Sequence, residues 1–227
     1  MPSAAAAAIR PTRRTQQERR DGTQRKLIDA TLACLTELGH ARTTTTEIVR
    51  LAGVSQGALF KHFPSKAELL AAAVEQLFDE VVSGYQATVA TLPAEQATHE
   101  ASFELLWSIF TGPRLTVAFE LYVVARTDSA LQASLEPVVR RHRAMLVEHA
   151  RLLFPVAAAN NADFDAWIDL LMCSMEGLVI ERFGAGDVTG PALALLKRIW
   201  LDTLARSEAP RTKSQRAHLR TSKDGRR

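Results

Sequence analysis

The chain of 227 residues has few of the residues that mark several large classes of protein. It contains two cysteines, Cys34 and Cys173, too far apart in sequence to resemble a disulfide framework or a zinc site. We expect both thiols to stay reduced. No apolar run approaches the ~18 residues of a membrane span, and residues 4–9 are too short a run for a signal-peptide core. These absences favour a cytoplasmic protein that does not enter a membrane.

Motifs that carry enzymatic chemistry are also missing. The sequence has no HExxH, no phosphate-binding glycine loop, no nucleophile paired with a base and no carboxylate pair that helical periodicity leaves unexplained. We therefore expect no enzyme, no metal and no cofactor. No stretch alternates as a β-strand does, and 47% hydrophobic residues are enough to bury a sizeable core. The sequence predicts an all-α protein of about nine helices.

Charge is strongly segregated along the chain. Residues 1–66 carry 11 Lys and Arg against 5 Asp and Glu, whereas residues 67–206 carry 10 against 18. Residues 207–227 are basic again, with 7 against 2. A basic N-terminal part joined to an acidic middle is typical of a nucleic-acid surface on one domain and a different task on the other.

Two short helices joined by a tight turn are predicted within residues 43–63. Thr44, with Glu47 three residues later, forms a capping box that opens the first helix. Gly53 gives the turn its backbone freedom, and Ser55 is the N-cap of the second helix. Such a pair is the form in which proteins often place a helix in the DNA major groove. An ordinary corner between two helices is the alternative.

A third helix follows at once, because Pro64 ends the second helix and Ser65 with Glu68 makes another capping box. Residues 25–70 resemble the N-terminal domain of the TetR family of bacterial regulators. The matching residues are Leu27, Ile28, Asp29, Ala30, Glu37, Gly39, Thr43, Thr44, Glu47, Ile48, Ala52, Gly53, Val54, Ser55, Gly57, Leu59, His62, Phe63, Ser65, Lys66, Leu69 and Leu70. The resemblance implies a helix-turn-helix DNA-binding domain followed by a helical domain that binds ligands and forms dimers. Where the family usually has tyrosine, this chain has Phe60, so a hydrogen bond from that position to a phosphate is in doubt.

The predicted DNA contacts divide by chemistry. Phosphate contacts are expected from helix starts and cationic side chains, namely Thr44, Thr45, His62 and Lys66. Base contacts are expected from the exposed part of the second helix, namely Gln56, Gly57, Ala58, Phe60 and Lys61. Two alternatives stay open: Phe60 as a core residue of this domain, and Lys61 as a solvated charge.

The chain divides into four predicted parts. Residues 1–22 are a disordered basic arm whose arginines are candidates for DNA contact, and residues 23–66 form the helix-turn-helix domain. Residues 67–206 form the helical effector-binding and dimerisation domain. Residues 207–227 are a disordered basic tail with the same open question of DNA contact.

Aromatic and polar residues of the second domain suggest a ligand pocket, although a helical core would contain the same types. The candidates are Trp107, Phe110, Phe119, Tyr122, His142, Met145, His149 and Met175. His142 and His149 lie two turns apart on one helix face, which suits contact with an effector better than a shared metal ion. Local partners at the edge of the apolar stripe are the alternative for both histidines.

The last two predicted helices are apolar over more than half their circumference, which suggests a surface for self-association, with a buried core helix as the alternative. The resemblance implies that these helices form a four-helix dimer interface. Its candidate residues are Trp167, Leu171, Met172, Leu178, Leu196, Ile199 and Trp200.

Together these patterns predict a DNA-binding transcriptional regulator. We expect a repressor that binds a palindromic operator as a homodimer and is released by a small molecule. A regulator without an effector, or an activator, is the nearer alternative. A helical carrier or enzyme with an incidental helix-turn-helix is the more distant one.

Overall fold

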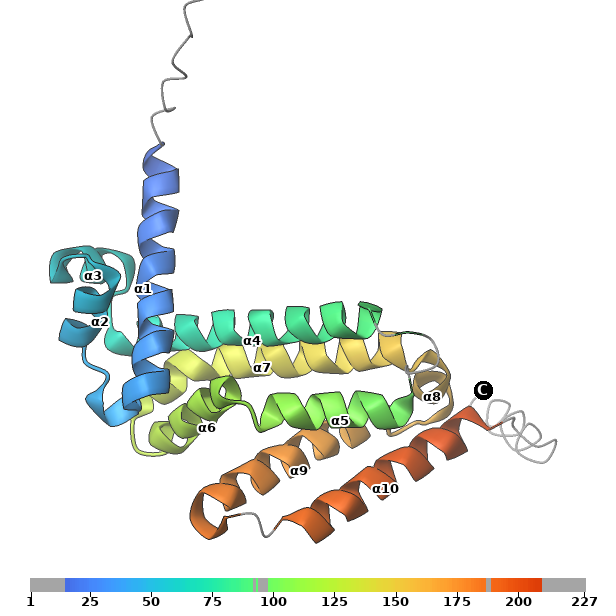
Figure 1. Ribbon diagram of the computed structural model, residues 1–227. Helices are drawn as coiled ribbons and strands as arrows, with labels where there is room; N and C mark the ends of the chain where they lie inside the picture. The colour runs from blue at the N-terminus through green and yellow to red at the C-terminus, as the bar shows by residue number, and fades with distance from the viewer. Residues whose placement is uncertain (1–14, 92, 94–97, 187–188, 210–227) are drawn as a thin grey trace, which may run out of the picture.

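The computed structural model describes residues 15–91, 93, 98–186 and 189–209, which contain ten α-helices, one 3₁₀ helix and no strand. This confirms the all-α prediction (Figure 1). The helices are α1 (Gln16–Leu38), η1 (His40–Arg42), α2 (Thr45–Ala52), α3 (Gln56–His62), α4 (Lys66–Thr91), α5 (His99–Phe110), α6 (Pro113–Ala125), α7 (Ser129–Leu153), α8 (Pro155–Asn160), α9 (Phe164–Ala185) and α10 (Gly190–Glu208). None of the described helices is both long enough and apolar enough to cross a membrane.

Helix α1 begins earlier than the sequence led us to expect. Thr15 and Glu18 form a reciprocal capping box: the Glu18 N–H donates to Thr15 Oγ1 at 3.1 Å, and the Thr15 N–H donates to Glu18 Oε2 at 2.7 Å. The prediction of a disordered arm is therefore wrong for residues 16–22, which are helical. Apolar periodicity failed there because these two turns face solvent on all sides. The rest of the arm, residues 1–14, lies outside the described residues.

The helix-turn-helix has most of the predicted local structure. Thr44 Oγ1 accepts from the Glu47 N–H at 3.2 Å, but the predicted capping box is only half formed, because the Glu47 carboxylate accepts from Arg50 Nε at 3.0 Å. Gly53 takes a left-handed conformation (φ 65°) at the turn. Ser55 Oγ then accepts from the Ala58 N–H at 3.1 Å and starts α3. These caps satisfy backbone donors that a helix start would otherwise leave unpaired.

Two hydrophobic cores lie at the two ends of the molecule. The small core joins α1, α2, α3 and the first turn of α4, and its buried residues are Leu27, Ala30, Cys34, Ile48, Leu59, Phe63 and Leu69. The large core fills the space between the remaining helices, with α4 and α7 side by side and α9 and α10 on the opposite side from α4 (Figure 1). Because Leu69 belongs to the small core, this core extends past the domain boundary that we predicted at residue 66.

Helix α8 is an element that the sequence analysis did not identify. Pro155 occupies the first turn, where a missing N–H costs nothing, and Ala157 is fully buried. Beside it, the Phe154 ring meets the edge of Trp200, which stacks on Trp167 at a centroid distance of 4.3 Å. Helix α10 ends at Glu208, so the first two residues of the predicted tail are helical; residues 210–227 lie outside the described residues.

Neighbouring residues of α3 allow a matched stability test. Leu59 is fully buried, whereas Phe60 is 48% exposed. We expect Leu59→Ala to lower the free energy of unfolding by about 2–5 kcal/mol through lost burial and a cavity. Phe60→Ala should change it by less than about 1 kcal/mol, because Phe60 already contacts water. Chemical denaturation followed by circular dichroism would measure both, and equal losses would contradict the assignment of Phe60 to the surface.

Candidate functional site

The outer face of α3 is formed by the residues that we predicted to read DNA bases. Gln56, Gly57, Phe60 and Lys61 are exposed, and Ala58 and His62 are partly exposed. Leu59 and Phe63 point the other way, into the small core. The core alternative for Phe60 is therefore wrong, and α3 has a free polar and aromatic face of a kind that suits a DNA groove.

The first turns of α2 and α3 lie next to each other. The Gln56 amide donates to the hydroxyls of Thr45 at 3.3 Å and Thr46 at 3.5 Å. Thr44, the N-cap of α2, is exposed beside them. Two helix N-termini at one surface favour an anion such as a phosphate, because their backbone N–H groups and dipoles point outward.

Lys66, predicted as a phosphate contact, is partly buried at the junction of the two cores. Burial lowers the pKa of its ammonium group, and the carboxylate of Asp128, the N-cap of α7, acts in the opposite direction. Its charge lowers the pKa of His40 in turn, after the larger effect of burial. Lys66 therefore lies close to the start of the second domain, and its contact with phosphate stays a prediction.

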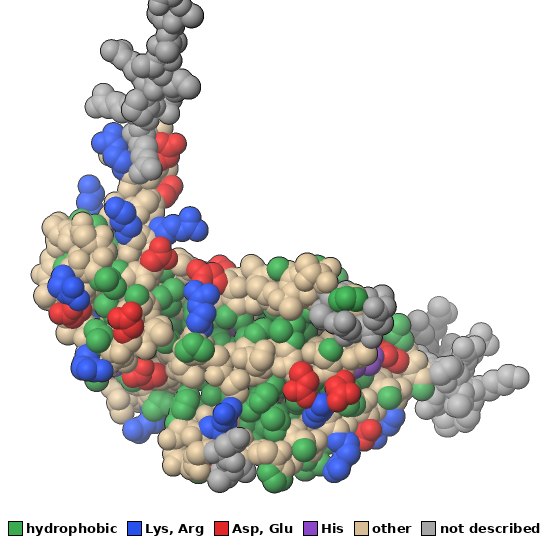
Figure 2. All heavy atoms as spheres, in the orientation of Figure 1, with side chains coloured by type: hydrophobic (Ala, Val, Ile, Leu, Met, Phe, Trp, Pro, Cys, Tyr) green, Lys and Arg blue, Asp and Glu red, His purple; other side chains and the backbone are tan. Residues whose placement is uncertain are grey.

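Basic side chains surround the helix-turn-helix. Arg19, Arg20, Arg25 and Lys26 are exposed along α1, whose first turns extend beyond α2 and α3 (Figure 1). Figure 2 shows the blue side chains of α1 and of the helix-turn-helix at this end of the molecule, interspersed with fewer red ones. This charge would attract a DNA backbone without reading its sequence.

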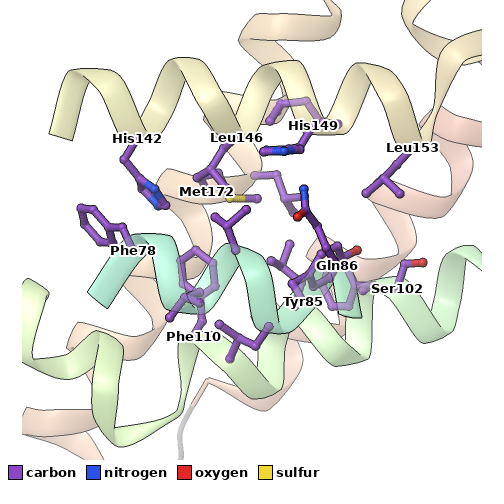
Figure 3. A pocket seen from close by; sticks show the side chains of 18 of the residues that line it. Phe78, Tyr85, Gln86, Ser102, Phe110, His142, Leu146, His149, Leu153 and Met172 are labelled. Carbon is purple, nitrogen blue, oxygen red and sulfur yellow. The ribbon is translucent and has the colours of Figure 1, made fainter. Parts of the chain in front are cut away.

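A cavity of about 360 Å³ lies within the second domain, between α4, α5, α7 and α9 (Figure 3). Phe110, Phe119, Tyr122, His142 and His149 line it, as predicted. Trp107, Met145 and Met175 are not among the described residues that line it, so the prediction is corrected for these three. Met175 is fully buried in the large core, which apolar spacing alone cannot distinguish from a cavity wall.

The sequence analysis did not assign several of the cavity residues to the pocket. They include Phe78, Tyr85, Gln86, Ser102 and Glu176, and also Met172, which the analysis had assigned to the dimer interface. An apolar stripe in a sequence does not indicate whether it faces a packed core or an open space.

His142 and His149 both point into the cavity from α7 (Figure 3). His142 stacks on the Phe78 ring, with centroids 3.8 Å apart, and burial together with Arg143 and Arg141 lowers its pKa to about 4. It is therefore neutral at pH 7. The Nδ1 atoms of His142 and His149 are buried without a hydrogen-bond partner among the described residues. No group of three or more His, Cys, Asp or Glu in the described part of the chain could hold a metal ion.

Helix α6 connects the cavity wall to the DNA-binding end. Phe119 and Tyr122 line the cavity, and between them Glu120 Oε1 accepts a hydrogen bond from the His40 N–H at 2.9 Å. This contact caps η1 directly after α1. At Gly39, with φ 73°, a Cβ atom would lie 3.3 Å from Glu120 Oε1, so a side chain there would crowd the contact.

Comparisons with known proteins agree with this arrangement. A family model described as bacterial regulatory proteins, tetR family, matches residues 27–73. The uncharacterized HTH-type transcriptional regulator Rv2912c of Mycobacterium tuberculosis (strain ATCC 25618 / H37Rv) is 32% identical over 169 residues, which cover 74% of this chain and 87% of that protein. This chain belongs to the TetR family. It is a transcriptional regulator with a helix-turn-helix domain.

Solved structures of TetR-family and related proteins have the same fold. A putative TetR-family transcriptional regulator from Rhodococcus sp. matches with a TM-score of 0.63 and 16% identity, over 81% of this chain and 98% of that one. The multidrug binding protein EbrR, crystallised with imidazole, matches with a TM-score of 0.56 and 18% identity, over 84% and 97%.

The predicted dimer face of this TetR-family chain needs a correction. Leu171, Met172 and Trp200 are 3%, 7% and 4% exposed within a single chain, so they belong to its own core. Trp167, Leu178 and Leu196 are partly buried, and Ile199 is exposed. Because α9 and α10 are apolar on most sides, their sequences did not indicate which side faces the core. The exposed large apolar residues of α9 and α10 are Leu170, Ile180, Phe183, Leu195 and Ile199.

The low pKa of His142 predicts a pH dependence of stability. Unfolded, this histidine would take up a proton near its ordinary pKa of 6.5, but the folded protein resists protonation until about pH 4. The unfolded state therefore binds more protons in this window, and folding is weakened as pH falls from 6.5 towards 4. We expect His142→Leu to remove about 2 kcal/mol of the stability loss between pH 7 and 4.5.

Urea denaturation at several pH values would measure this effect. Leu146→Met, one turn further along α7, adds no titratable group and should keep the wild-type pH dependence. Parallel curves for wild type and His142→Leu over the whole range would overturn the assignment.

Proposed function

We propose that this TetR-family regulator is a cytoplasmic repressor. Its dimer would occupy a palindromic operator, and a small molecule in the cavity would release it. The observation that carries the proposal is the contact between Glu120 and His40, because one turn of α6 both lines the cavity and caps η1, directly after α1. A ligand that changes the position of α6 would thereby change that of the helix-turn-helix.

The cavity also adjoins α4, which begins in the DNA-binding core and continues along the cavity. Leu69 packs in the small core, and Phe78, Val81 and Val82 line the cavity further along the same helix. A rigid helix that ends in two different environments transmits displacement between them. EbrR, which resembles this chain in fold, is named a multidrug binding protein, and this supports a ligand role for the cavity.

DNA binding would use the exposed face of α3, the starts of α2 and α3, and the basic surface of α1. Lys61 is the one exposed cation of α3. A lysine there can contact guanine O6 and N7, and such a base contact contributes about 1–3 kcal/mol of discrimination. Thr44, Thr45, His62 and Lys66 would position the protein on phosphates.

Fluorescence anisotropy with the duplex directly upstream of the reading frame would test this interface. We expect Lys61→Ala to weaken binding to that duplex about tenfold or more and to an unrelated duplex of equal length much less. Arg140→Ala removes an equal charge from the exposed face of α7 and should leave both affinities unchanged. Equal loss on both duplexes would reduce Lys61 to a general charge, and no saturable binding at low salt would contradict the proposed operator.

A second copy of the chain is proposed to cover the apolar face of α9 and α10. Leu170, Gly177 and Gly184 recur every seven residues and are exposed, so one side of α9 allows a partner helix to approach closely. Phe183 is 62% exposed at the end of that helix, and Leu195 and Ile199 extend the surface along α10. Large apolar side chains gathered on adjacent helices mark a protein interface. A dimer would present two α3 helices to the two half-sites of a palindrome.

Sedimentation velocity at micromolar concentration would test the dimer. We expect Ile199→Glu to produce monomers, because it buries two carboxylates near the centre of the interface. Leu51→Glu is the matched control: Leu51 is 48% exposed, against 46% for Ile199, but lies on α2. A wild-type monomer, or dissociation by both substitutions alike, would contradict this interface.

Activation instead of repression is the second candidate. A promoter fused to a reporter distinguishes the two: deletion of the regulator raises expression from a repressed promoter and lowers it from an activated one.

A further inference from the structure

The cavity contains little charge. Of the described residues that line it, only Glu176 has a charged side chain, and neither Lys nor Arg is among them. The Glu176 carboxylate is already paired with Arg143 Nη2 at 3.4 Å. Arg143 in turn also contacts Asp169 and the Cys173 thiol. An anionic ligand would therefore meet no cation, and a cationic ligand would have to compete with Arg143.

Three polar atoms near this space are buried and unpaired. They are the Nδ1 atoms of His142 and His149 and the Nε1 atom of Trp200, whose side chain is 4% exposed. All three residues line the cavity. A buried polar group without a hydrogen-bond partner destabilises the folded protein, because it has lost its bonds to water. Each of these atoms is almost completely inaccessible, so its side chain would have to turn towards the cavity before a ligand could pair with it. A ligand that pairs with one of them would recover part of this lost stability.

The pairing chemistry narrows the ligand further. An indole N–H can only donate, so Trp200 requires an acceptor. A neutral imidazole nitrogen donates or accepts depending on its tautomer, and a hydroxyl group suits either case. His142 is neutral, and burial with two nearby arginines opposes its protonation, so it would not supply the charge that a buried carboxylate needs.

The shape of the cavity suits an elongated molecule. Phe78, 3% exposed and stacked on His142, closes one end, whereas Gln86 and Leu153 are exposed at the other (Figure 3). His142 and His149 are seven residues apart on one helix, which corresponds to about 10 Å along the cavity wall. The walls between them are apolar, with Leu146 and Met172 as examples.

We infer that the effector is an uncharged, hydroxyl-bearing hydrophobic molecule, an alcohol or a phenol, whose apolar body fills the cavity and whose hydroxyl group pairs with one of its unpaired polar atoms. This inference rests on the proposed function of the cavity as the effector site. Desolvation disfavours charged molecules of the same size, since the cavity offers no counter-ion for an anion.

Three probes with the same chain and different head groups would test the inference on the full-length protein. Isothermal titration calorimetry at about pH 7.5 would compare 1-octanol with octanoate and with octylammonium, both of which are ionised at that pH. We expect saturable binding of 1-octanol with a dissociation constant at least about tenfold lower than that of either ion. Octanoate or octylammonium binding as tightly as 1-octanol would overturn the inference, and so would the absence of binding by all three.

Substitutions would establish that the head group meets the histidines. His149→Leu should weaken 1-octanol binding about tenfold, which corresponds to one buried hydrogen bond, and leave binding of naphthalene, a probe without polar atoms, unchanged. His149→Gln keeps a donor and an acceptor and should retain the preference for 1-octanol. Leu146→Met is the control within the same wall. Loss of naphthalene binding in His149→Leu, with an unchanged melting curve, would mean that the histidine only shapes the cavity.

The same samples separate the ligand class from the proposed function. If 1-octanol binds selectively but does not weaken DNA binding in the anisotropy assay, the inferred ligand class is supported and the proposed release of DNA by the effector is contradicted. If octanoate binds best and does release DNA, the regulatory function holds and the inferred class is wrong.

Discussion

The two hydrophobic cores share α1 and α4, and the rest of the structure depends on this sharing. Helix α1 packs Leu27 into the small core and Leu32 into the large one, and α4 does the same with Leu69 and Leu70. The small core, with seven buried residues, is too small to hold α2 and α3 without these helices. Because interiors are close-packed, neither shared helix can shift in one core without disturbing the other. The orientation of α3 is therefore a property of the whole chain.

Polar contacts add a second connection around α6. At one end of this helix, Arg114 pairs with Glu80 of α4, and at the other Glu120 caps η1. Gln76 of α4 donates to Asp29 of α1 at 2.8 Å, so the same three helices are also joined by hydrogen bonds along their surface. Exposed ion pairs contribute little stability, with a median of about 0–1 kcal/mol. These contacts instead fix the position of α6 relative to α1 and α4, the two helices that both cores share.

Sequence predicted best what depends on a few neighbouring residues. Gly53 and Ser55 have their expected roles, because turns and helix caps are decided within about four residues. Helix α8 was missed because its formation depends on burying Ala157 against distant helices. Trp200 was assigned to a dimer surface because α10 is apolar on several sides; only the stacking on Trp167 reveals that it faces inward. The residue types of the second domain indicated a pocket, but they could not indicate which residues line it, because cavity walls and packed cores contain the same side chains.

The unpaired polar atoms of the cavity lower the stability of the folded protein. In a regulated protein, a ligand can offset this cost when it binds. Filling the site with leucine and phenylalanine would remove the cost of leaving His142 and His149 unpaired. A ligand that satisfies them stabilises the conformation that binds it, by about 2.7 kcal/mol at a concentration 100 times its dissociation constant. This energy changes DNA affinity only as far as the ligand binds the DNA-bound and released conformations differently. Because α4, α6 and α7 form both the cavity wall and the junction beside Lys66 and Glu120, a rearrangement of that wall alters the support of α3. In the proposed function, the unpaired polar atoms of the cavity and the helices shared beneath α3 would be two parts of one coupling between ligand and DNA.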